Sequence, residues 1–208
     1  MPSSEPLQLS PGKMKILKAV ATLLEDPSAK LTVNRIANHI SVTEAALYRH
    51  YRSKEDILQA LLEYTESHFL APLNYVQKQP HMTPATQLKY VYDHYMSFLD
   101  GHPGLARLLL GQGNTEAAGV SDKVKLLHAK LRSQLAMILK WAQAKGALSG
   151  DLTPDQVVEL FYGTIMGSAM AMTCHLPQLS AEERWQAFAA SAFAQHHQET
   201  QPKGVMSA

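Results

Sequence analysis

A short basic segment near the N-terminus contains the side chains of this sequence whose types and spacing could do chemistry. Between Lys30 and Lys54 the chain has five Lys or Arg residues and a single acid, Glu44, which gives a local charge of +4 in a protein of net charge +1. Lysine, arginine, tyrosine and histidine can all donate hydrogen bonds to phosphate oxygens. We therefore expect a local nucleic-acid-binding surface, although the overall charge gives no sign of one.

Two short predicted helices have to position these side chains. Thr32 is a typical N-cap for the first helix, which turns Ile36 inward, and after a tight turn at Ser41 the second helix turns Leu47 inward. Two short helices about three residues apart match the spacing of a helix-turn-helix. Spacing alone also fits an ordinary small helical bundle, but the basic charge beside the second helix favours DNA binding.

The composition indicates that the whole chain is helical. Leu and Ala make up 54 of the 208 residues, against 16 Val and Ile, which favours helices over strands. A first helix should begin at Ser10-Pro11 and a long one at Ser53, and full capping boxes are expected at Thr153 and Ser180. Further helices are expected near residues 84–100, 104–111, 121–145, 154–174 and 180–197. The sequence therefore predicts an all-α protein.

Residues 31–37 and 42–58 resemble the DNA-binding domain of TetR-family transcriptional regulators. The family's LYRHF-x-SK-x-x-L signature is matched almost position for position from Leu47, with Tyr51 in place of Phe. The resemblance implies an N-terminal three-helix helix-turn-helix domain and a C-terminal helical domain for dimerisation and ligand binding. It also implies a sequence-specific transcriptional repressor that binds a near-palindromic operator in double-stranded DNA and is released by an effector. The apolar residues of the middle helices predict a small, largely apolar effector, and the lack of catalytic motifs predicts that the protein is not an enzyme.

Within this resemblance, the candidate DNA-binding residues have expected roles. Thr43, Glu44 and Ala45 open the second helix and should approach base edges, whereas Tyr48 and His50 should donate to phosphates. The alternative is that the two aromatic side chains are simply packed in the domain. The full set of predicted DNA-binding residues is Thr32, Thr43, Glu44, Ala45, Tyr48, Arg49, His50 and Lys54.

The residues around this helix set further expectations. Lys54 begins the long helix, where its charge and the helix N-terminus both favour phosphate, and Thr32 resembles the family's phosphate anchor. Glu44 departs from many relatives, because an acid near DNA repels phosphate unless it accepts a hydrogen bond from a cytosine amino group. Leu47 and Tyr51, four residues apart on the inward face, should belong to the core.

Two C-terminal helices are candidates for a homodimer interface. In the first, small residues recur every four positions and would let another helix approach closely, and the last helix has a broad apolar face. The resemblance implies that both pair with their symmetry mates in a four-helix bundle. The alternative for each helix is that its face belongs to the protomer's own core. The predicted interface residues are Gly163, Gly167, Ala171, Trp185, Phe188 and Ala192.

The middle helices are rich in aromatic residues and methionine, which could line an apolar effector pocket or simply fill the core. The predicted pocket residues are Tyr92, Tyr95, Phe98, Trp141, Phe161, Met166 and Met170. We expect no cofactor and no metal, since the adjacent Cys174 and His175 alone do not make a metal site.

The expected organisation is a mobile arm at 1–12, the helix-turn-helix domain at 13–58, the effector-binding and dimerisation domain at 59–200 and a disordered tail at 201–208. The single cysteine, the lack of a leader-like N-terminus and the lack of an apolar run of membrane-span length predict a cytoplasmic protein. The expected DNA binding would associate it with the nucleoid.

A second resemblance leaves an alternative function open. Residues 43–50 and 102–111 are similar to nucleoid occlusion factors, TetR-fold proteins that bind DNA and inhibit the division protein FtsZ. A Pro-Gly-Leu helix such as the one at 103–105 also occurs in ordinary repressors of the family. The likeness outside the recognition helix, which is the second helix of the helix-turn-helix, is short. The ligand-responsive repressor is therefore the first expectation.

Overall fold

The computed structural model describes residues 9–26, 28, 30–112, 119–150 and 152–193. This part of the chain is helical, apart from its turns and one isolated β-bridge. Its helices, in order, are α1 (Pro11–Leu23), α2 (Val33–His39), α3 (Glu44–Tyr48), α4 (Lys54–Gln77), α5 (Pro84–Gly101), α6 (Pro103–Leu109), α7 (Val120–Ala144), α8 (Pro154–Thr173) and α9 (Ala181–Ala192). The predicted all-α class is confirmed.

Local capping explains where most of these helices begin. Seven of those described start after a Ser or Thr whose side chain accepts a hydrogen bond from the backbone N–H three residues further on. The capping boxes expected at Thr153 and Ser180 are both present. At the start of α4 Ser53 caps the helix without a reciprocal bond, because the Asp56 carboxylate accepts from the Arg52 N–H rather than from the Ser53 N–H.

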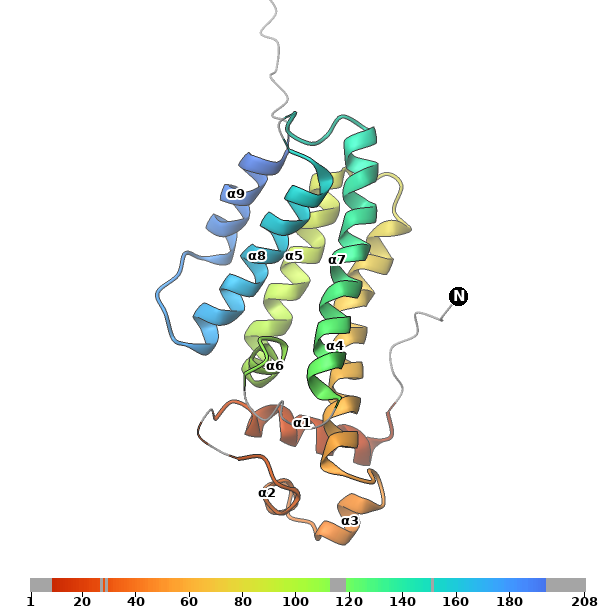
Figure 1. Cartoon of the computed structure of the whole chain (residues 1–208), viewed down its shortest axis with the longest axis vertical. Coiled ribbons are helices and arrows are strands. Elements are labelled where there is room, and N and C mark those ends of the chain that lie inside the picture. Colours follow the sequence, from red (N-terminus) through yellow and green to blue (C-terminus); the bar gives the residue numbers. More distant parts are fainter. Residues whose placement is uncertain (1–8, 27, 29, 113–118, 151, 194–208) are drawn as a thin grey trace, which may run out of the picture.

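The helices form two parts that meet at α1 (Figure 1). The three short N-terminal helices lie at one end of the molecule, and the long helices run side by side above them. Helix α4 is continuous from the first part into the second, so the predicted boundary at residues 58 and 59 falls inside a helix. None of the helices among the described residues is long and apolar enough to cross a membrane.

The apolar core is also shared between the two parts. One cluster of buried side chains fills the bundle of long helices, and the other joins the N-terminal helices to α6 and the start of α7 through residues such as Leu105 and Val124. At this junction α6 rests directly on α1, because a Cβ at Gly104 would lie only 1.9 Å from the Ala21 carbonyl oxygen. The N-terminal helices are therefore packed onto the bundle through shared buried side chains.

Two predicted boundaries shift in the structure. Helix α9 ends at Ala192, short of the predicted 197, because Phe193 has an extended backbone and forms a bridge with Leu148. Helix α1 begins at Pro11 after the N-cap Ser10, as predicted, so Pro11 and Gly12 belong to the helix rather than to the arm drawn at 1–12. The rest of the predicted helix end, the tail at 201–208 and residues 1–8 of the predicted arm lie outside the described residues.

Candidate nucleic-acid interface and regulatory helices

The predicted recognition helix is α3, and its outward surface is open to solvent. Tyr48 is 51 % exposed, and Thr43 and Ala45 are exposed beside it. Leu47 and Tyr51 point inward and are buried, as predicted from their spacing. The Thr43 hydroxyl caps the helix by accepting from the Ala46 N–H, which fixes the first turn of α3.

The carboxylate of Glu44 is exposed but is held by a hydrogen bond from α2. Its Oε1 accepts a hydrogen bond of 3.0 Å from the side-chain amide of Asn34, and Asn34 in turn accepts from the Asn38 amide. Glu44 thereby links the N-terminus of α3 to α2. Sequence reasoning assigned this carboxylate to base contacts and did not foresee the bond, since Asn34 lies ten residues earlier on a different helix.

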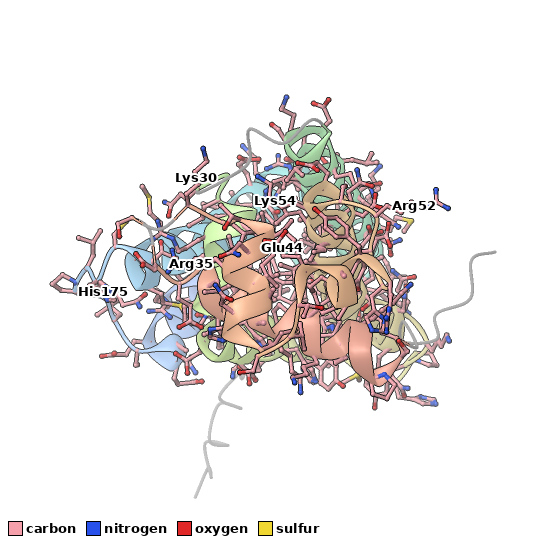
Figure 2. The ribbon with its side chains drawn as sticks, turned by 90° about the horizontal axis from the view of Figure 1, so that it is seen from below. Lys30, Arg35, Glu44, Arg52, Lys54 and His175 are labelled. Carbon is pink, nitrogen blue, oxygen red and sulfur yellow. The ribbon has the colours of Figure 1, made fainter. Side chains whose placement is uncertain are left out.

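The basic charge at this end is smaller than the local sequence suggests. Arg35 forms an ion pair of 3.3 Å with Asp26, which lies just outside the predicted basic segment. Hydrogen bonds from Ser28, and then from Arg35, hold the pKa of Asp26 below its usual value. Lys30 and Arg52 lie at opposite edges of this end of the molecule (Figure 2), so the remaining cations spread along the surface.

The residues beside the recognition helix differ in their exposure and in their contacts. His50 is exposed, but its ring lies against the first turn of α1, where a Cβ at Gly12 would come within 2.7 Å of it. Lys13 places its ammonium group 5.5 Å from the centre of the Tyr51 ring. Burial raises the pKa of Tyr51 to about 12, and its hydroxyl has no hydrogen-bond partner among the described residues.

The remaining predicted phosphate contacts occupy helix starts. Thr32 is exposed, and its hydroxyl caps α2 by accepting from the Arg35 N–H. Lys54 is the half-buried first residue of α4, directly after the cap Ser53. Arg49 is exposed at the end of α3. The helix-turn-helix therefore presents hydroxyl, guanidinium and ammonium groups toward the same end of the molecule.

The predicted effector-pocket residues do not converge on one cavity. Tyr92, Tyr95 and Phe161 are buried in the packed core of the bundle. The hydroxyls of both tyrosines donate to main-chain carbonyl groups, that of Tyr92 to Ala181 at 3.0 Å and that of Tyr95 to Phe69 at 2.8 Å. These hydrogen bonds indicate a structural role, because each buried hydroxyl is satisfied within the protomer.

The other members of this set lie at the edge of the core or outside it. Phe98 and Met166 are partly buried against the packed side chains. Trp141 is 36 % exposed on α7, and Met170 is 52 % exposed on α8. No group of three or more His, Cys, Asp and Glu residues in the described ranges is arranged to hold a metal ion.

The predicted interface residues divide into two groups. A groove of about 410 Å³ between α8 and α9 is lined by Gly163, Gly167, Ala171 and Phe188. A Cβ at either glycine would meet nothing within 4 Å, so the protomer's own packing does not require a glycine there. The other two residues, Trp185 and Ala192, are buried against the protomer's own core, because α9 turns this part of its apolar face inward.

A helix-turn-helix with an exposed recognition helix, mounted on a larger helical bundle, defines a DNA-binding regulator. The family model for bacterial regulatory proteins of the tetR family matches residues 16–61. The N-terminal part of the chain therefore carries a DNA-binding domain of the type found in TetR-family transcription regulators, which are not enzymes.

The fold extends over nearly the whole chain. The ketosteroid transcriptional regulator KstR2 of Mycobacterium tuberculosis has a TM-score of 0.71 and 16 % identity, covering 90 % of this chain and 98 % of that one. The regulator FadR from Bacillus subtilis, solved in complex with stearoyl-CoA, has a TM-score of 0.68 and 20 % identity, covering 85 % and 95 %. At these identities the likeness concerns the fold.

A sequence relative covers a comparable length. The nucleoid occlusion factor SlmA of Vibrio cholerae serotype O1 is 25 % identical over 178 residues, which make up 82 % of this chain and 90 % of the relative. The likeness to nucleoid occlusion factors is therefore longer than the two segments at 43–50 and 102–111, and the expectation that it is short outside the recognition helix is wrong.

Proposed function

We propose that this chain is a homodimeric transcriptional repressor that binds a near-palindromic operator and is released by a small, largely apolar effector. The observation that carries the proposal is the outward surface of α3, where Ala45 and Tyr48 are exposed and Thr43 is exposed with its hydroxyl engaged in the helix cap. Such a surface fits the major groove, whose base edges specify sequence.

The assignment of Lys54 to a phosphate is tested by changing one cation at a time. Lys54→Ala should weaken binding to every duplex and reduce the slope of log affinity against log salt by about one unit. Lys78, just after the other end of α4 and about 36 Å away, provides the matched control. Equal affinity and equal salt slope for Lys54→Ala and the wild type would contradict the phosphate contact.

The groove between α8 and α9 supports the homodimer. Its two exposed glycines lower helix propensity by about 1 kcal/mol each and gain nothing from packing inside the protomer. A helix from a second copy would use the space that they leave. Such a dimer would place two recognition helices about 34 Å apart, one turn of duplex, which accounts for a near-palindromic operator.

A graded pair of substitutions tests this interface. Gly167→Leu should give monomers in sedimentation and lose operator binding, because its side chain fills the space for the partner helix. Gly167→Ala adds only a methyl group and improves helix propensity, so it should remain closer to the wild-type dimer. A Gly167→Leu protein that sediments as a dimer and binds the operator would rule out this arrangement.

The proposal of an apolar effector is supported by the composition of the bundle core and by one solved structure that shares the fold. The bundle core is aromatic and rich in apolar side chains, and B. subtilis FadR, which shares the fold, was solved with stearoyl-CoA, a ligand with an apolar acyl chain. A regulator of this kind needs a ligand that binds one arrangement of its dimer better than another. Release of an operator fragment by apolar compounds, measured by fluorescence anisotropy, tests this part of the proposal.

A nucleoid-occlusion role, with DNA-dependent inhibition of FtsZ assembly, is the second candidate. The observation that favours it is the 25 % identity to V. cholerae SlmA over most of both chains. Mapping the binding sites across a genome and mixing the DNA-bound protein with FtsZ separates the two functions. One or two promoter sites and intact FtsZ polymers support the repressor, whereas many dispersed sites and disrupted polymers support nucleoid occlusion.

A further inference from the structure

A second cavity lies where the DNA-binding end joins the bundle. Its volume is about 220 Å³, and its walls come from α1, α4, the end of α5 and α6. Leu17, Leu61 and Leu105, which are almost completely buried, line its apolar side. The polar groups at its edge include Lys18 on α1 and Tyr64 on α4. The cavity is therefore amphipathic and includes residues from both parts of the molecule.

The cavity lies next to the contact between α1 and α6, where the N-terminal helices join the bundle. Ala21, whose carbonyl oxygen meets Gly104 at the contact between α1 and α6, also lines the cavity. In Figure 1, α1 crosses beneath the long helices at this point. A molecule bound here would touch α1 and the bundle at once, next to the tightest contact between them. Its occupancy would therefore affect how far α1 can move relative to α6.

The polar groups favour a particular kind of ligand. The Nδ1 atom of His102 lies 2.8 Å from the Phe98 carbonyl oxygen, so it donates its proton there, and Nε2 of the neutral ring is an acceptor. Burial raises the pKa of Tyr64, so its hydroxyl keeps its proton and can donate. A hydroxyl group on a ligand could accept from one of these side chains and donate to the other.

The cavity size limits the ligand. Typical drug-sized sites have volumes of about 300–1,000 Å³, whereas an apolar cavity of about 150 Å³ accepts benzene. We propose that the cavity binds a one- or two-ring aromatic molecule bearing a hydroxyl group, and that the bound molecule weakens operator binding by fixing α1 against α6. The proposal rests on the repressor function above and places an effector site at the joint.

Direct binding is tested first, without DNA, by calorimetric titration with 2-naphthol and with naphthalene. Wild-type protein should bind 2-naphthol more tightly than naphthalene. Tyr64→Phe should lower the affinity for 2-naphthol about 3- to 10-fold and leave the affinity for naphthalene unchanged. Gly101 lines the cavity, and a Cβ there would meet nothing within 4 Å. Gly101→Leu should therefore fold, fill the cavity and abolish binding of both compounds.

Ala129→Leu, which adds a comparable side chain at an exposed position of α7, is the control and should bind both compounds like the wild type. Binding of 2-naphthol that is unchanged in Gly101→Leu would overturn the site, as would a failure of the folded wild type to bind either compound. These titrations contain no DNA, so their outcome is independent of whether the protein is a repressor.

Operator binding is measured second. 2-Naphthol should weaken operator binding by the wild type and by Ala129→Leu at least about 5-fold, which is the lower end of common allosteric couplings. Gly101→Leu should bind the operator weakly and show no response. Bound 2-naphthol with unchanged operator affinity would overturn the regulatory role. Failure to select any specific operator would instead count against the proposed repressor function.

Discussion

The contact between α6 and α1 predicts that Gly104→Ala destabilises the protein although it improves helix propensity. A Cβ at position 104 would lie 1.9 Å from the Ala21 carbonyl oxygen, and both groups belong to helix backbones that cannot rotate away. Ordinary non-bonded contacts lie near 3.5 Å, so the two helices would have to separate by about 1.5 Å.

The magnitude follows from two opposing contributions. Replacing Gly by Ala in a helix stabilises it by about 0.5–1 kcal/mol, whereas overpacking a tight contact costs about 1–3 kcal/mol. We expect the clash to dominate, so Gly104→Ala should lower the free energy of unfolding by about 1–2 kcal/mol. Gly101→Ala is the matched control three residues away, because its Cβ meets nothing, and it should be neutral or stabilising.

Urea denaturation at one fixed protomer concentration measures both variants, since the stability of a dimer depends on concentration. Hydrogen exchange then locates the change, and the amides of α1 should lose protection in Gly104→Ala while those of α8 keep it. A Gly104→Ala protein as stable as Gly101→Ala would refute the view that α6 is closely packed on α1 at this contact.

Three further changes have expected outcomes. Tyr162→Phe removes the hydroxyl that bonds His128 Nδ1, and should lower the free energy of unfolding by about 1 kcal/mol in urea titrations. Ser53→Ala removes the cap of α4 and should cost about 1 kcal/mol by the same measurement. Hydrogen bonds from Ser180 lower the folded-state pKa of Glu183, so its contribution is present above the ordinary glutamate pKa of about 4.3 and is lost as the pH falls through the folded-state value. The difference in melting temperature between the wild type and Glu183→Ala should therefore be largest near neutral pH and should shrink on acidification.

Helix starts could be predicted from the sequence because their causes are local. The side chains of Thr153 and Gln156 each accept a hydrogen bond from the other residue's backbone N–H, three residues away. The local sequence pattern is therefore sufficient to predict this cap. The inward side of α3 was predicted for the same reason, since Leu47 and Tyr51 are separated by one helical turn. The TetR signature in this region then allowed the fold of the whole chain to be predicted from a short sequence pattern.

Contacts between distant segments could not be predicted in this way. The partner of the Tyr92 hydroxyl is a main-chain carbonyl 89 residues later, and a tyrosine in an apolar helix looks alike whether it lines a pocket or fills a core. The apolar face of α9 raised the same difficulty, because periodicity identifies a face without identifying what covers it. Trp185 proved to cover the protomer's own core, and Phe188 also reaches the groove.

The shared core between the two parts limits how such a regulator can respond. Leu105 on α6 and Val124 on α7 belong to the same buried cluster as Leu17 on α1, and α4 runs through both parts without interruption. A close-packed interior resists continuous deformation, so the DNA-binding end is expected to move as a block rather than swing on a loop. Any signal that changes the spacing of the recognition helices must then pass through α4 or through the contact between α6 and α1. These are the elements that surround the cavity at the joint, which is why occupancy of a small site there can alter DNA binding although no ligand atom needs to approach the DNA.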